Sequence, residues 1–192
     1  LETLPRTAQC LSVQAQSANA VIEYNGFEIN FRSTNGANGT YVFNVNRDID
    51  DNSGGQTSVN FVNIPNTATV IINLNRNANV ATAIRANNMF DSSGNSGNNF
   101  SPELRSRILW NVYNSSSALV GGSAQDAMTL QGGYLEGSYL QWDKTTTITT
   151  MALSGHNGRF ITRGSVIQNA AGSEFHNYPF IGELPASCGD AL

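Results

Sequence analysis

GHNGRFITRGSVIQNAAGSEFHNYPFIGELP, from Gly155 to Pro185, is the most informative part of this 192-residue chain. It contains two short β-type runs, 159–162 and 165–168, separated by Arg163 and Gly164, and a polar turn then leads to Glu174. Strands of about four residues are not stable alone and need neighbours in a sheet. The pattern therefore predicts stacked short strands, like the rungs of a β-solenoid.

The end of this segment carries a motif: Glu174-Phe175-His176-Asn177, then Phe180, Gly182 and the pair Leu184-Pro185. It resembles the closing motif of choice-of-anchor A domains, which are extracellular modules of surface proteins. Two upstream blocks agree with that family, NIPNTATVIINL at 63–74 and ILWNVYN at 108–114. The resemblance covers about the last two-thirds of the chain and implies a surface setting, but no common activity. The C-terminal layout also distantly resembles solenoid ice-binding and adhesin domains.

We therefore expect a mainly β fold: a β-solenoid with antiparallel strands in its N-terminal part and one or two short helices packed alongside. Asn25-Gly26 predicts a two-residue hairpin turn. Apolar spacing predicts a helix over about 7–18, and Ser101-Pro102-Glu103 predicts a second over about 102–109. Arg105 and Arg107 in the second helix are expected to face solvent. Strands are expected at 20–24, 27–31, 40–45, 57–62, 69–74, 127–130, 134–135, 139–142, 145–153, 158–162 and 165–168.

The length predicts one domain, residues 1–192. Choice-of-anchor A domains usually carry glycine-rich rungs before the part matched here, and this sequence shows no such pattern. We expect the N-terminal rungs to be missing, which would leave an exposed sheet edge at that end. The expected partners are copies of the chain itself or a separate N-terminal segment that completes the solenoid.

The composition and the two cysteines limit the expected partners and the expected location of the protein. Only 12% of residues are charged and the formal net charge is −4, so a nucleic-acid partner is not expected. No apolar run is long enough for a membrane span. Cys10 and Cys188 predict a disulfide that joins the two ends of the chain, two buried thiols being the alternative. Together with glycosylation sequons this predicts a secreted, extracellular or cell-surface protein. The sequons begin at Asn38, Asn99 and Asn114.

An acidic loop offers a metal site. Asp48, Asp50 and Asp51 precede Gly54-Gly55, and their carboxylate oxygens suit Ca²⁺. The spacing is not that of an EF-hand, and a solvated turn is the alternative. No other cofactor is expected.

The two histidines, His156 and His176, are the candidates for catalysis. Glu174 lies two residues before His176, so a strand places both on one face, where a carboxylate can orient an imidazole. The sequence contains no nucleophile elbow, zinc motif or phosphate loop. We expect no enzymatic activity and interpret a group of C-terminal residues as a structural clasp that ties the last strand to the solenoid. The clasp consists of Glu174, His176, Asn177 and Phe180.

The sequence thus predicts a structural or adhesive module of an extracellular layer, matrix or self-assembling fibre. The alternative is a ligand-binding domain for carbohydrate, such as surface glycans, or for ice. Exposed aromatic side chains would stack on a sugar, and a threonine row in the run 145–150 would order water. The candidate ligand-binding residues are Tyr134, Tyr139, Trp142, Thr145, Thr147 and Thr149.

Overall fold

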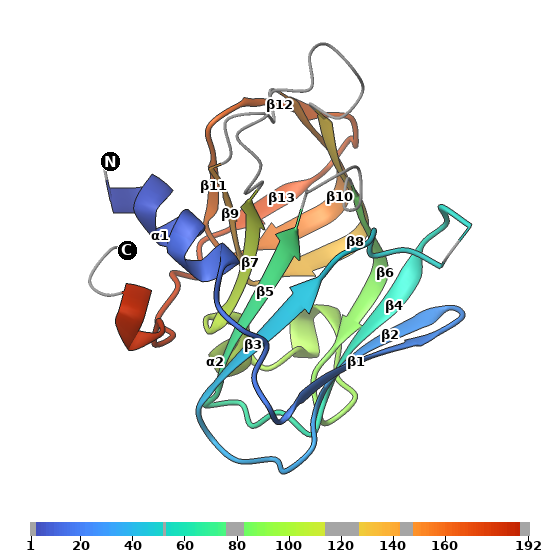
Figure 1. Cartoon of the computed structure of the whole chain (residues 1–192). Coiled ribbons are helices and arrows are strands. Elements are labelled where there is room, and N and C mark those ends of the chain that lie inside the picture. The colour runs from blue at the N-terminus through green and yellow to red at the C-terminus, as the bar shows by residue number, and fades with distance from the viewer. Residues whose placement is uncertain (1–2, 52, 76–82, 114–126, 143–147, 189–192) are drawn as a thin grey trace.

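The computed structural model describes residues 3–51, 53–75, 83–113, 127–142 and 148–188, and within them the chain is mainly β (Figure 1). The strands form two sheets. Sheet A contains β1 (Ala20–Asn25), β2 (Glu28–Ser33), β4 (Thr57–Val62), β6 (Ala83–Phe90), β8 (Ala127–Glu136), β10 (Ile148–Asn157), β12 (Ser165–Gln168) and β13 (Glu174–His176). Sheet B contains β3 (Thr40–Val45), β5 (Thr69–Asn75), β7 (Ile108–Tyr113), β9 (Ser138–Gln141) and β11 (Phe160–Thr162).

From β2 to β12, successive strands go alternately to sheet A and sheet B. Each strand pairs in parallel with the strand two places earlier, so that Phe31 on β2 lies opposite Phe61 on β4. A two-residue hairpin is confirmed, but it lies one position later than predicted: β1 and β2 are antiparallel, Asn25 pairs with Glu28, and the turn residues are Gly26 and Phe27. The expectation that β3, β4 and β5 are also antiparallel is wrong. Parallel neighbours in one sheet need a long crossover connection between them. Here each connection includes a strand of the other sheet, so it is long enough for parallel pairing.

The main core lies between the two sheets. Phe31 is at its centre, with ring centroids 5.1 Å from Phe43, 5.8 Å from Phe61 and 6.2 Å from Trp110. Along β4 every second residue is buried, the period of a strand with one face on the core. The layers of aromatic and branched side chains therefore fix the register of the stacked strands.

Helix α1 (Thr3–Ser12) covers the outer face of sheet B (Figure 1). Ala8 and Leu11 pack there against Val42, Ile71, Leu109 and Leu140. The helix ends earlier than the predicted 7–18, because residues after Gln14 run beside β3, where the Val42 N–H donates to Ser17 Oγ at 2.9 Å. Helix α2 (Pro102–Arg105) is capped by Ser101 as predicted, and it ends before 109 because β7 begins at Ile108. None of the described helices is long and apolar enough to cross a membrane.

Residues 177–188, which we call the C-terminal strap, run back past the starts of the sheet B strands. The Ile181 N–H donates to the Ser106 carbonyl and the Glu183 N–H to Thr69 Oγ1, each at 2.8 Å. The short helix η4 (Ala186–Cys188) follows, and Cys188 forms the predicted disulfide with Cys10 of α1. The strap therefore connects the last layers of the stack to the first.

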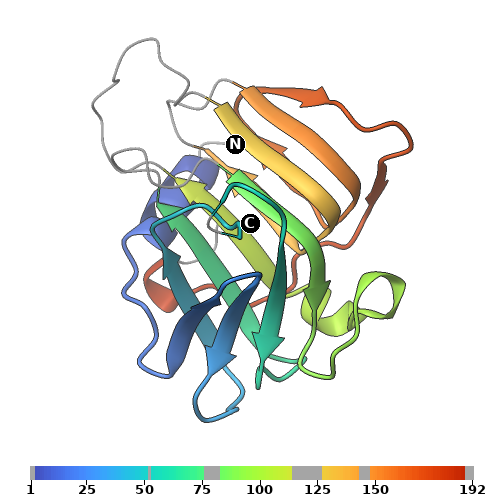
Figure 2. The ribbon, with the colours of Figure 1, turned by 90° about the vertical axis from the view of Figure 1, so that its right-hand side faces the viewer.

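The two ends of the stack differ. At the N-terminal end, β1 closes sheet A, with Ile22 and Tyr24 packed against the core, and residues 14–17 cover β3 of sheet B. At the other end, no further described strand follows β11, β12 and β13, and we call this the open end (Figure 2). The predicted exposed edge at the N-terminal end is present in sheet A, where β1 has no further partner among the described strands, whereas residues 14–17 cover β3 of sheet B. A second exposed edge, which the sequence did not predict, lies at the open end.

Candidate functional site

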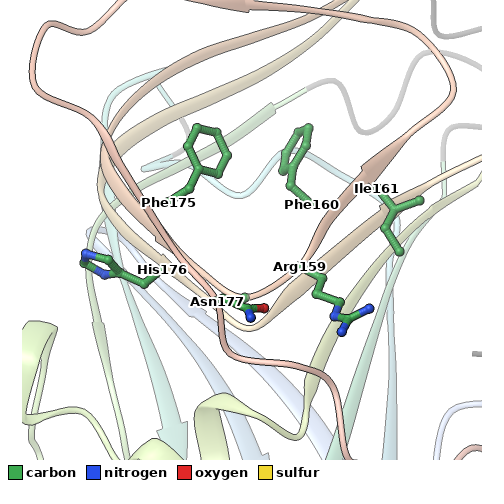
Figure 3. Close-up of a pocket in the computed structure, with 7 residues that line it drawn as sticks. Arg159, Phe160, Ile161, Phe175, His176 and Asn177 are labelled. Atoms are coloured by element: carbon green, nitrogen blue, oxygen red, sulfur yellow. The ribbon is translucent and has the colours of Figure 1, made fainter.

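A hollow of about 360 Å³ lies at the open end. Figure 3 shows Phe160 and Phe175 pointing into the space within the last turn of the chain, while Arg159 and His176 lie at its border. Phe160 is on β11 and Phe175 on β13, and their rings are in edge contact with centroids 6.2 Å apart. The lining residues are Gly158, Arg159, Phe160, Ile161, Phe175, His176 and Asn177.

His156 lies directly under these two rings. It is fully buried, and its ring centroid is 5.5 Å from that of Phe160 and 6.0 Å from that of Phe175. Neither ring nitrogen has a hydrogen-bond partner of acceptable geometry among the described residues, although the nearby Arg159 backbone slightly favours the charged ring. Burial in this apolar setting lowers the pKa of His156 to about 4, so the imidazole is neutral at pH 7.

Acid should destabilise the fold through His156. Its pKa is about 4 when folded and about 6.5 when unfolded, so the unfolded chain takes up the proton first as the pH falls. The contribution of the neutral His156 to the free energy of unfolding is fully present above pH 6.5. It decreases as the pH falls towards 4, by about 3 kcal/mol in total. Urea unfolding between pH 7 and pH 4 measures this slope. His156→Leu should flatten it and His176→Gln should not; equal slopes in all three proteins would contradict the assignment.

A row of polar side chains links β13 to α2. Glu174 and His176 contact each other (Oε2 to Nε2, 3.0 Å), and His176 Nδ1 lies 2.6 Å from Asn157 Oδ1. The Asn157 amide donates to both carboxylate oxygens of Glu136 at 3.0 Å. Arg105 completes the row, with its Nε 2.5 Å from Glu136 Oε2. These contacts place two of the proposed clasp residues in one network.

Within this network, Glu136 and Arg105 are both buried. Burial raises the pKa of Glu136, opposed by the Arg105 guanidinium and the Asn157 amide. The prediction that Arg105 faces solvent is wrong, because its side chain is enclosed with this carboxylate. The pair was not predictable from the sequence, since 31 positions separate the two residues.

The other two clasp residues lie apart from the row. Asn177 lines the hollow at the open end, and Phe180 packs against the apolar cluster between sheet B and α1. The clasp therefore divides into a polar part on sheet A and an apolar part on sheet B, and its role stays a prediction.

The predicted aromatic platform is not assembled. Tyr139 is fully buried and stacks on Phe160 with centroids 4.7 Å apart, so its assignment as a ligand-binding residue is wrong. Tyr134 stacks on His176 at 6.4 Å, and Trp142 packs beside the cluster under α1. The three rings thus belong to three different parts of the molecule.

The threonine row is also not as predicted. Thr149 is buried, and its hydroxyl donates to Gln141 Oε1 at 2.7 Å, so it faces the interior. Thr145 and Thr147 lie outside the described residues. Since side chains alternate along a strand, the outward residues of β10 are those of the opposite parity, beginning with Ile148 and Thr150.

These outward residues belong to a regular surface on β8, β10 and β12, on the side of sheet A that Figure 2 turns toward the reader. Thr129, Thr150 and Ile167 stand opposite one another on adjacent strands. None of the eight outward residues of this surface is charged, and Arg85 of the adjacent strand β6 aligns with Gln131 at its border. We call it the uncharged face, and it consists of Thr129, Gln131, Ile148, Thr150, Ala152, Ser154, Ser165 and Ile167.

The acidic loop forms ion pairs. Arg85 Nη1 lies 3.6 Å from a carboxylate oxygen of both Asp48 and Asp50, and Arg47 also pairs with Asp50 at 3.2 Å. Asp51 instead accepts hydrogen bonds from Ser53 and Gly55, which lower its pKa. In the part of the chain described, no cluster of three His, Cys, Asp or Glu side chains is placed to hold a metal. Calcium binding stays a prediction.

Two of the three sequons can be located. Asn38 and Asn99 are exposed, Asn38 in the loop before β3 and Asn99 in the short helix η2 (Gly97–Asn99). Asn114 lies outside the described residues. Glycosylation at these positions stays a prediction.

Comparison with known proteins gives one family. Residues 2–177 match the family model described as "Putative Ice-binding-like adhesive domain". No curated protein and no solved structure matches the chain. The match supports the resemblance to ice-binding and adhesin domains, and it does not extend to a choice-of-anchor A identity.

Proposed function

Because the chain belongs to the family of ice-binding-like adhesive domains, we propose that it is a non-enzymatic adhesive module that holds a hydroxyl-covered surface with its uncharged face. Ice and crystalline polysaccharide are two surfaces with this chemistry. The observation that carries the proposal is the ordered, charge-free row of outward side chains on β8, β10 and β12.

The chemistry of this face suits such a surface. Adjacent strands lie about 4.8 Å apart, so in-register rows such as Thr129, Thr150 and Ile167 repeat at a fixed spacing. Removing water from hydroxyl and methyl groups costs far less than removing it from charges. A paired sheet is also rigid before it binds, which lowers the entropic cost of adhesion.

The setting that we propose is extracellular. A disulfide between Cys10 and Cys188 is typical of oxidising compartments, and an adhesive family is compatible with a cell-surface layer or matrix. The alternation of parallel strands between sheets A and B supports a β-solenoid, and the choice-of-anchor A resemblance supports attachment to a larger surface protein.

The test is adsorption to ice and to cellulose or chitin particles. The protein should be retained by at least one of them, which also identifies the surface. Thr150→Lys places an unpaired charge in the middle of the face, and retention should fall roughly tenfold or more. Gln9→Lys adds the same charge on the exposed side of α1 and should retain full binding. No adsorption by the wild type, or full adsorption by Thr150→Lys, would exclude this face.

A further inference from the structure

The hollow at the open end is larger than a packing void. Its volume of about 360 Å³ falls within the range of about 300 to 1,000 Å³ that is usual for small-molecule sites. Phe160 and Phe175 point into it, and Phe175 is 51% exposed although its register with His156 turns it toward the interior (Figure 3). Two neighbouring aromatic rings that the described chain leaves open to solvent indicate a surface for a ligand.

The border of this hollow is polar. Asn177 is exposed at the base of the last turn, and its side-chain amide, which can donate and accept, has no hydrogen-bond partner among the described residues. Arg159 lies at the border, and the Glu174 side chain, 3.0 Å from His176, is 63% exposed. Because charges of both signs are present, a ligand ion of either sign would meet a like charge. The border therefore favours a neutral ligand that carries hydroxyl groups.

A second hollow, of about 680 Å³, adjoins the first. Phe175, His176 and Asn177 line both, and the second extends toward α2 and η2. Its own aromatic side chain is Tyr178, whose ring centre lies 4.7 Å from the guanidinium carbon of Arg105. The two hollows together form a groove with an aromatic ring in each part. A ligand with repeating units fits a groove of this kind better than a single compact molecule does.

We propose that this groove binds a neutral, soluble sugar chain, with one sugar ring against Phe160 and Phe175 and the next beside Tyr178. The C–H face of a sugar ring is apolar and packs on aromatic side chains, while its hydroxyl groups pair with the polar groups around them. Asn177 lines both hollows and hydrogen-bonds these hydroxyls. The site is separate from the uncharged face, which lies on the outer side of sheet A.

The histidines of the chain report on this groove. There are only two, His176 in the lining and His156 in contact with both phenylalanine rings. The probes are soluble tetrasaccharides of glucose and of N-acetylglucosamine, the repeating units of cellulose and chitin. In NMR titrations, at least one of them should shift the ring signals of both histidines to saturation, and His176→Gln assigns the two signals. If neither sugar shifts both signals, the proposal is wrong.

A pair of variants tests the aromatic lining. Phe175→Ala removes the ring that lines both hollows and should weaken binding about tenfold in the same titration. The variant should fold, because half of this side chain is already exposed. Val166→Ala is the control: it shortens another exposed apolar side chain at the open end, outside both hollows, and should bind as the wild type does. Unchanged binding by Phe175→Ala, or an equal loss in Val166→Ala, would overturn the proposal.

The groove and the uncharged face can be tested apart. Thr150→Lys should bind the soluble sugars as the wild type does, since Thr150 lies on the outer side of β10. Phe175→Ala should still adsorb to ice or to the particles, because crystals present few free chains. Loss of sugar binding in Thr150→Lys would place the ligand on the uncharged face and overturn this proposal. A wild type that binds the sugars but adsorbs to no surface would contradict only the proposed function of that face.

Discussion

Replacing Cys10 and Cys188 together with alanine should lower the free energy of unfolding by about 5 kcal/mol. The disulfide spans 178 positions, so it closes a loop of nearly the whole chain, and the loss of entropy in the unfolded state grows with loop length. The strap and α1 should also separate from sheet B, because Cys188 is part of the cluster that holds Ala8 and Leu11. Urea unfolding at neutral pH measures the effect.

Two controls accompany this prediction. Reduction of the wild-type protein should lower its stability by a similar amount. Ser187→Ala, which removes an exposed hydrogen bond to Gln14 and a long contact with Cys188 Sγ but leaves the disulfide intact, should change stability by less than about 0.5 kcal/mol. If the double alanine variant unfolded at the same urea concentration as the wild type, the disulfide would not be what holds the strap.

Arg105→Met should cost about 3 to 5 kcal/mol, an effect nearly as large. Arg105 is 3% exposed and Glu136 is fully buried, so the variant leaves a carboxylate in the interior with only the Asn157 amide beside it. An uncompensated buried charge is far more costly than the absence of the whole pair. The midpoint of chemical unfolding is again the measurement.

The double variant Arg105→Met/Glu136→Leu should recover a substantial part of this loss, because it removes both charges. Arg32→Met breaks the ion pair between Arg32 and Glu23. Both side chains are about one-third exposed, so the variant should lose less than about 1 kcal/mol of stability. Equal effects of Arg105→Met and Arg32→Met would show that the buried pair is not the stabilising feature proposed.

The local features of the fold were predictable from the sequence. Asn25-Gly26 predicted the hairpin turn to within one residue, Ser101 specified a helix cap, and the two cysteines paired as expected. These features depend on a few adjacent residues, or on there being only two cysteines in the sequence. The mainly β character followed from the short apolar runs for the same reason.

The partners of each strand, and the face that it buries, were not predictable. Alternation in the run 145–150 gave two possible faces, and only the pairing of β10 with β8 shows that Thr149 is inside and Thr150 outside. Arg105 looked like a surface residue because a four-residue helix does not reveal what covers it. The exposed edge at the open end was not predicted, because it depends on which strand is the last one in each sheet.

The bond between Cys10 and Cys188 has a mechanical consequence for an adhesive. A pull on the chain before Cys10 and after Cys188 passes through the covalent link between them, and the strands from β1 to β13 carry none of the load. The domain lengthens little under tension, since the residues between the cysteines cannot be drawn out while the bond is intact. Its resistance to force is then set by the strength of a sulfur–sulfur bond, and the sheets only have to keep the proposed binding face in shape.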